Sequence, residues 1–196
     1  IVDALRSTVA LTAHSPFNGR VATILPVTRN GQDPWIQQFL AAQNHAEIVG
    51  NDEMSVGLWY YQIPTLFEYN PVLSPLFHAL VKRALQRPPV PHQRNIVVLT
   101  NPDTRILRLL GVRYVITREA DGSVGEQRVG DGDGEKRWIL SELPDANLAT
   151  YSPTSLEVRN DLASTLDHLL DEHTDLTRSA VVHQEVAGPL MTIQSS

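Results

Sequence analysis

The chain has 196 residues, a formal net charge of −6 and no cysteine, and 42% of its residues are hydrophobic, which is ordinary for one globular domain. The acidic balance argues against a nucleic-acid partner, because a surface that follows a phosphate backbone needs an excess of Lys and Arg. The lack of cysteine excludes disulfides, Cys-zinc sites and thiol catalysis. We expect a single domain over residues 1–196 that folds without a metal or cofactor.

Both ends of the chain favour a piece of a larger protein. It begins at Ile1 with no initiator Met and no signal-peptide pattern, and it ends in the apolar-alternating stretch 191–196, typical of a strand that needs a partner. No apolar run approaches the roughly 18 residues that a membrane helix requires. We therefore expect a soluble domain from a larger membrane protein, with any membrane attachment elsewhere.

The first part of the chain combines short helices with one strand. Apolar residues four apart favour a short helix within 1–13, and Arg20 to Leu25 has the pattern of a strand. Pro34 at a first helical position predicts a helix to about Ala46. Residues 50–70 are the least regular part and the richest in aromatic side chains.

A helix is predicted from about Pro71 to Gln86, with its apolar residues on one face. These inward residues are Leu73, Leu76, Phe77, Leu80, Val81 and Ala84. A proline-rich spacer at 87–91 ends this helix.

The clearest pattern lies between Asn95 and Arg118. It predicts a buried strand at Ile96–Leu99, then a helix capped by Asn101 with Pro102 at its first position. Gly111 supplies a left-handed stop before a strand at Val112–Thr117. Such a strand–helix–strand unit favours neighbouring parallel strands joined by a right-handed crossover.

The C-terminal part predicts a hairpin, further strands and one helix. The polar segment Glu119–Lys136 is typical of a long hairpin loop. Asn160 or Asp161 caps a helix that runs through Glu172, with Leu162, Leu166, Leu169 and Leu170 facing inward. The predicted strands are Arg137–Leu143, Leu148–Tyr151, Leu156–Arg159, Ala180–Gln184 and Leu190–Gln194. Together these elements predict an α/β fold with a mixed, partly parallel sheet and helices packed against it, in a two-layer or three-layer sandwich.

Three passages carry a family resemblance. The first is 50–53 (GNDE) followed by 57–70 (GLWYYQIPTLFEYN), the second is 107–116 (LRLLGVRYVI), and the third is 161–170 (DLASTLDHLL) leading to 178–182 (RSAVV). In this order they resemble the extracytoplasmic portion of bacterial YfhO-like polytopic membrane proteins, which look like membrane-embedded glycosyltransferases of the GT-C type. The resemblance spans roughly Arg20 to Pro189, with gaps, and its motifs are structural rather than catalytic.

The resemblance implies a protein with many membrane helices and a soluble α/β region on the periplasmic or extracellular side of a bacterial cell membrane. Its donor would be a lipid-linked sugar, and its catalytic acids would lie in loops near the membrane helices. Those loops are outside this chain, so no catalytic residue is assigned here. The implied partners are the protein's own transmembrane region and a glycan or polyprenyl-linked sugar.

The best candidate binding site is the polar and aromatic loop after residue 50. Carboxylates and amides bind sugar hydroxyls, whereas Trp and Tyr faces stack on the apolar side of a pyranose ring. The candidate residues are Asn51, Asp52, Glu53, Trp59, Tyr60, Tyr61, Tyr69 and Asn70. The alternative is that the aromatic residues anchor the core and that Asp52 is a helix cap.

Other candidate motifs favour structural interpretations. The alternating carboxylates at 130–135 lack the span of a calcium loop and are typical of a solvated hairpin. His168 and His173 are five apart, unlike the i, i+4 pair of a zinc-binding helix. The sequence has no Gly-x-Ser-x-Gly elbow, phosphate-binding loop or dinucleotide fingerprint, so no metal or cofactor is predicted.

Three functions remain open at this point. The chain is a non-catalytic extracytoplasmic domain that helps to bind a glycan acceptor or lipid-linked sugar, or a structural and interaction domain without a ligand. The third possibility is a free-standing soluble hydrolase whose site is assembled from distant residues.

Overall fold

The computed structural model describes residues 3, 5–7, 19–24, 58, 61–66, 74–86, 99–118 and 138–183, and the following account concerns these residues. The predicted helix at 34–46, the hairpin segment at 119–136 and the strand at 190–194 lie outside them. Within the described part, no helix is both long enough and apolar enough to span a membrane.

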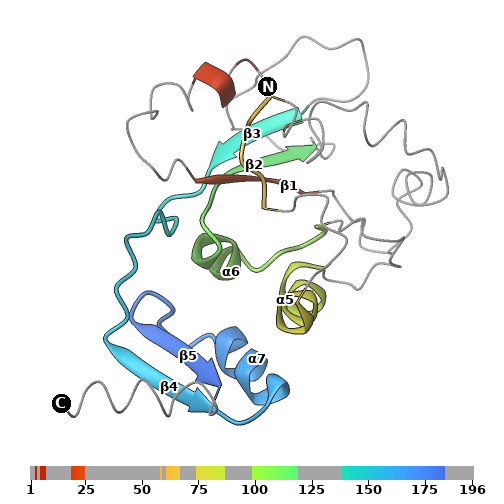
Figure 1. Cartoon of the computed structure of the whole chain (residues 1–196). Helices are drawn as coiled ribbons and strands as arrows, with labels where there is room; N and C mark the ends of the chain where they lie inside the picture. Colours follow the sequence, from red (N-terminus) through yellow and green to blue (C-terminus); the bar gives the residue numbers. More distant parts are fainter. Residues whose placement is uncertain are drawn as a thin grey trace, which may run out of the picture.

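The larger sheet has three strands in the order β1–β2–β3 (Figure 1). Strand β1 (Arg20–Ile24) pairs in parallel with β2 (Val112–Arg118), and β2 pairs antiparallel with β3 (Trp138–Glu142). A second sheet consists of the parallel strands β4 (Ser155–Arg159) and β5 (Ser179–His183). The predicted α/β fold with a mixed, partly parallel sheet is therefore confirmed.

The neighbour of β2 differs from the prediction. Leu99 forms a parallel bridge with Ile24, which also pairs with Thr117 of β2. Strand β1 therefore lies between Leu99 and β2, and the two ends of the predicted strand–helix–strand unit are not adjacent. The expectation of neighbouring strands was wrong because a segment from much earlier in the chain occupies the position between them.

A β-bulge at Arg113 sets which face of β2 each side chain occupies. Arg20 pairs with Val112 and Val21 pairs with Tyr114, which leaves Arg113 as an extra residue in the ladder. Gly19 makes this possible, because its φ is +82° and a Cβ there would lie 2.5 Å from the Arg113 Cβ. At the start of β2, the bulge therefore reverses which face of the sheet successive side chains occupy.

The helical segment that follows residue 74 lies on one face of the larger sheet (Figure 1). Helix α5 (Pro75–Leu80) is capped by Ser74 and continues as the π-helix η1 (Val81–Leu85), whose register shows in the 3.1 Å bond from Gln86 N to Val81 O. The predicted helix is confirmed over this span, but Leu76 is exposed rather than inward-facing.

Helix α6 (Thr104–Leu109) begins later than predicted. Its cap is Asp103, whose side chain accepts a hydrogen bond from Arg105 N, rather than Asn101. The Asp103 N–H donates to Ala84 O of η1 at 2.8 Å, so the residue that caps α6 also contacts another helix. Gly111 ends the segment with φ +77°, as predicted.

The last helix, α7 (Leu162–Leu170), lies between β4 and β5 in sequence, and Asp161 caps it, as predicted. Leu166 is buried and both Leu169 and Leu170 pack against the core, but Leu162 is exposed. The strand predicted at Leu148–Tyr151 is absent. Ala149 has φ +62°, which no strand residue adopts, and the segment is an irregular connection.

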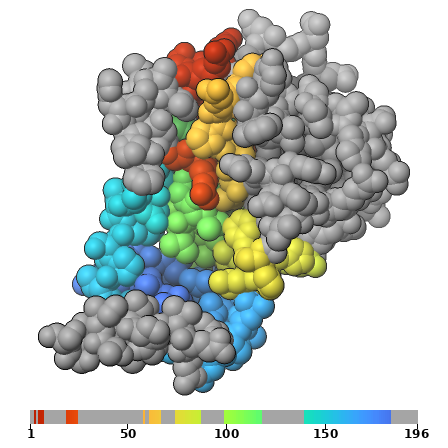
Figure 2. Space-filling model, in the orientation of Figure 1, coloured from red at the N-terminus to blue at the C-terminus, as the bar shows by residue number. Residues whose placement is uncertain are grey.

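Buried apolar side chains of the described residues form two clusters, one on each face of the larger sheet. The first core holds Ala22, Leu66, Leu80, Val81, Ala84, Leu85, Leu99, Ile106, Leu107, Val112, Val115, Leu166 and Leu176. The second core holds Leu5, Val21, Leu58, Ile63, Tyr114 and Ile116. In the space-filling view, the residues of α5, α6 and α7 lie in direct contact (Figure 2), consistent with α7 sharing the first core.

Candidate functional site

A tight turn presents Tyr61 and Gln62. The Leu58 carbonyl accepts hydrogen bonds from Tyr61 N and Ile63 N, each at 3.1 Å. Leu58 and Ile63 are fully buried in the second core, so both ends of the turn are anchored. Gln62 is exposed with φ +59°, a left-handed conformation that costs a non-glycine residue roughly 1 kcal/mol.

The chain after this turn runs along the edge of β1 opposite β2, the edge on which Leu99 also pairs. Val21 N donates to Pro64 O at 2.8 Å, and Leu66 N donates to Val21 O at 2.9 Å. Thr65 forms a parallel bridge with Val21 between these two bonds. The turn is therefore fixed to the sheet by backbone hydrogen bonds and by its buried neighbours.

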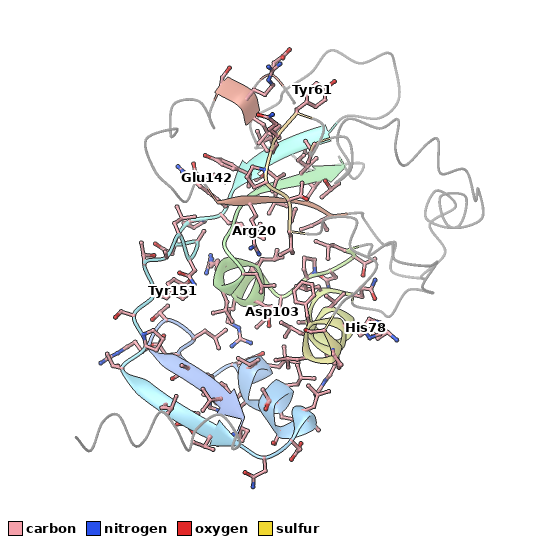
Figure 3. All side chains as sticks on the ribbon, viewed as in Figure 1. Arg20, Tyr61, His78, Asp103, Glu142 and Tyr151 are labelled. Atoms are coloured by element: carbon pink, nitrogen blue, oxygen red, sulfur yellow. The ribbon has the colours of Figure 1, made fainter. Side chains whose placement is uncertain are left out.

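An arginine accompanies the aromatic ring of this turn. Tyr61 is half-buried against the second core, and Figure 3 shows it at the end of the molecule near the N-terminal helical residues. The guanidinium carbon of the exposed Arg6 lies 5.9 Å from the ring centre, within cation–π range. The Tyr61 ring and the Arg6 guanidinium therefore lie together, and the exposed Gln62 follows Tyr61 in the turn.

Tyr61 is the one predicted site residue that the described structure includes. The others, Asn51, Asp52, Glu53, Trp59, Tyr60, Tyr69 and Asn70, lie outside the described residues. Their proximity to Tyr61 therefore stays a prediction. The alternative, that the aromatic residues anchor the core and that Asp52 caps a helix, also stays a prediction, because among the aromatic residues of this loop the structure describes Tyr61, which is partly buried against the second core.

A cluster of polar side chains that no sequence pattern predicted lies at the β-bulge. It is on the face of the larger sheet that carries the second core. Arg113 Nε donates to Glu142 Oε1 at 2.8 Å, and the Arg113 guanidinium carbon is 5.1 Å from the Tyr114 ring centre. Burial raises the pKa of Tyr114, Arg113 lowers it and Glu142 raises it, with a net increase, so the hydroxyl stays protonated at neutral pH. Only the bulge and the β2–β3 register bring these groups together, and neither has a local sequence signal.

The two histidines that do not have zinc-pair spacing, His168 and His173, have different surroundings. His168 Nδ1 lies 3.1 Å from Arg159 Nη2, and His173 is exposed. Among the described residues, no three His, Asp or Glu side chains converge in a way that would hold a metal ion. The loop at 130–135 lies outside these residues.

Comparison with protein-family models, with curated proteins and with solved structures finds no match for this chain. The family resemblance of the three passages therefore stays a prediction, and function has to be inferred from the described residues themselves.

Proposed function

We propose that this chain is a non-catalytic extracytoplasmic domain of a membrane protein that resembles YfhO-like proteins of the GT-C type, and that it binds a glycan acceptor or a lipid-linked sugar. The bound sugar contacts the turn at Tyr61 and Gln62. The chemical step belongs to the membrane-embedded part of the protein.

The observation that carries this proposal is the geometry of the Tyr61 turn. An aromatic ring half-buried on a rigid backbone loses little conformational entropy when a sugar stacks on it. The neighbouring Gln62 amide both donates and accepts hydrogen bonds, as sugar hydroxyls require.

The three passages that carry the family resemblance support a scaffold role for the rest of the chain. Passage 57–70 contributes Leu58, Ile63 and Leu66 to the two cores, and passage 107–116 forms the end of α6 and most of β2. Passage 161–182 includes α7 and most of β5. These residues build the framework that holds the exposed turn, so the described parts of the three passages serve packing.

The burial of the first passage favours a second candidate, a structural or interaction domain without a ligand. Most described side chains of the first passage are core residues, which is what that candidate requires. The two candidates differ in a single measurable property, the binding of a saccharide at Tyr61.

A binding experiment with the full chain separates the candidates. Two probes are titrated by calorimetry, a panel of neutral gluco-, galacto- and manno-disaccharides and polyprenyl-phosphate glucose in lipid nanodiscs. We expect Tyr61→Ala to weaken binding of the preferred probe about tenfold, because stacking on an aromatic ring contributes on the order of 1 kcal/mol.

The control is Tyr151→Ala, which removes an aromatic side chain from the irregular segment after β3 rather than from the turn. Equal weakening by both alanine variants would show that the loss is not specific to the turn. If the unaltered chain binds neither probe, the domain without a ligand becomes the better description.

A further inference from the structure

The Arg6 guanidinium lies over the Tyr61 ring, so a ligand that stacks on this ring meets a positive charge. The guanidinium carbon is 5.9 Å from the ring centre, close to the roughly 6 Å limit of a cation–π contact. Arg6 is exposed, so water screens this attraction and the side chain is weakly held. Leu5, the residue before Arg6, is fully buried in the second core, which also holds both ends of the Tyr61 turn. The two backbones are therefore fixed to the same core, and the guanidinium is accessible.

Arg6 has no acidic partner in the part of the chain that the structure describes. The ion pairs there belong to four other arginines, each with its own carboxylate, namely Arg83, Arg105, Arg113 and Arg159. Asp3 lies three residues before Arg6, a spacing at which helical side chains can pair, but these two described residues form no ion pair. A guanidinium that lies over a ring uses its flat face, so the N–H groups along its edge remain able to donate to a ligand.

The charge of a ligand decides what it gains from this arginine. A neutral sugar that stacks on Tyr61 replaces the cation–π contact and offers the guanidinium only uncharged hydroxyls. A sugar that carries a phosphate or carboxylate offers a pair of charged oxygens, which match two parallel N–H groups of a guanidinium. Because the net charge of the chain is −6, no general attraction for anions takes the place of this local one.

We propose that Arg6 is a specificity-determining residue that selects an anionic saccharide. The phosphate or carboxylate of the ligand accepts hydrogen bonds from the Arg6 guanidinium while the sugar ring stacks on Tyr61. The inference rests on the proposed function and narrows it, because it favours a saccharide with an anionic group over a neutral glycan. Tyr61 contributes to the binding of any sugar, whereas Arg6 contributes to the binding of a charged one.

Three probes with closely related pyranose rings test the charge preference. Methyl glucoside is neutral, glucuronic acid carries a carboxylate, and glucose 1-phosphate carries a phosphate. Each is titrated by calorimetry against the full chain, and inorganic phosphate serves as an anion without a sugar. The variants are Arg6→Gln, which removes the charge, and Arg6→Lys, which keeps it. Lys82→Gln is the matched control, because it removes the same unit of charge from an exposed residue of η1, whose buried residues belong to the first core.

We expect one or both anionic sugars to bind the unaltered chain about tenfold more tightly than methyl glucoside, as a solvent-exposed charge-assisted hydrogen bond allows. The tighter of the two identifies the anionic group. Arg6→Gln is expected to abolish the preference without weakening the binding of methyl glucoside, and Arg6→Lys is expected to keep most of it. Lys82→Gln is expected to change neither. The melting temperature of Arg6→Gln, followed by circular dichroism, is expected to equal that of the unaltered chain because Arg6 is exposed.

The outcomes separate this inference from the proposed function. Equal binding of neutral and anionic sugars, weakened by Tyr61→Ala, overturns the inference and leaves the proposed function in place. The inference is also overturned if Arg6→Lys or Lys82→Gln loses the preference as fully as Arg6→Gln, or if inorganic phosphate binds as tightly as glucose 1-phosphate. If the unaltered chain binds none of these sugars and no polyprenyl-phosphate glucose, both are overturned.

Discussion

Arg105 holds the end of α7 against α6, and its removal is expected to destabilise the protein markedly. Arg105 Nη1 donates to Asp171 O at 2.8 Å, and Nη2 donates to Leu170 O at 3.1 Å. Nη2 also lies 3.0 Å from Asp103 Oδ2. Because the last carbonyls of a helix have no partner within the helix, this guanidinium satisfies groups that α7 itself leaves open.

The size of the effect follows from these contacts. A hydrogen bond with a charged donor contributes about 1.5–3 kcal/mol when buried, but the Arg105 side chain is 30% exposed and that of Asp103 is 12% exposed. Solvent screening reduces each contribution, and the Asp103 carboxylate keeps its bond to Arg105 N. We therefore expect Arg105→Ala to lower the free energy of unfolding by about 2–4 kcal/mol.

Urea unfolding followed by circular dichroism measures this change. Asp167→Ala is the matched control, because Asp167 connects α7 to another helix through its 2.6 Å ion pair with Arg83. That pair is exposed, at 45% for Arg83 and 66% for Asp167, and its loss is expected to cost less than about 1 kcal/mol. If Arg105→Ala loses no more stability than Asp167→Ala, carbonyl capping by Arg105 does not hold α7 in place.

Two further predictions concern the backbone and a surface carboxylate. Ala149→Gly is expected to raise the free energy of unfolding by about 1 kcal/mol, because Ala149 has φ +62° and glycine adopts this conformation without strain; a loss of stability in urea unfolding would contradict this. The two Thr177 hydrogen bonds lower the pKa of Asp175, so the contribution of this carboxylate to stability is present at neutral pH and lost as the pH falls through its lowered pKa. Thr177→Val is expected to raise the pKa of Asp175 in an NMR titration, and an unchanged pKa would show that the hydroxyl is not responsible.

Much of the local structure could be predicted from the sequence. The β-branched run at 112–117 forms a strand, Gly111 adopts the left-handed stop, and Asp161 caps α7. These features depend on side chains acting on their own backbone within a few residues. A local pattern is then sufficient, because the competing interactions are also local.

Other elements depended on partners distant in the chain. Asn101 and Asp103 are equally good caps by type, and the bond from Asp103 N to Ala84 O accompanies the choice of Asp103. The stretch 148–151 has the composition of a strand, but Asn147 beside it donates to the Arg108 and Leu109 carbonyls at the end of α6. The chain between β3 and β4 therefore follows an irregular path, along which Ala149 has a left-handed backbone.

The candidate site also combines features that the sequence predicts with features that depend on the tertiary structure. The sequence by itself determined that residues 50–70 are rich in aromatic and polar side chains, and that β2 and the described helices form. Only the tertiary structure decided that Tyr61 lies on an anchored turn beside Arg6, and that a bulge places Arg113 next to Tyr114 and Glu142. The physical reason is that strand order and register are set by pairing between distant segments, and a shift of one residue moves a side chain to the other face of the sheet.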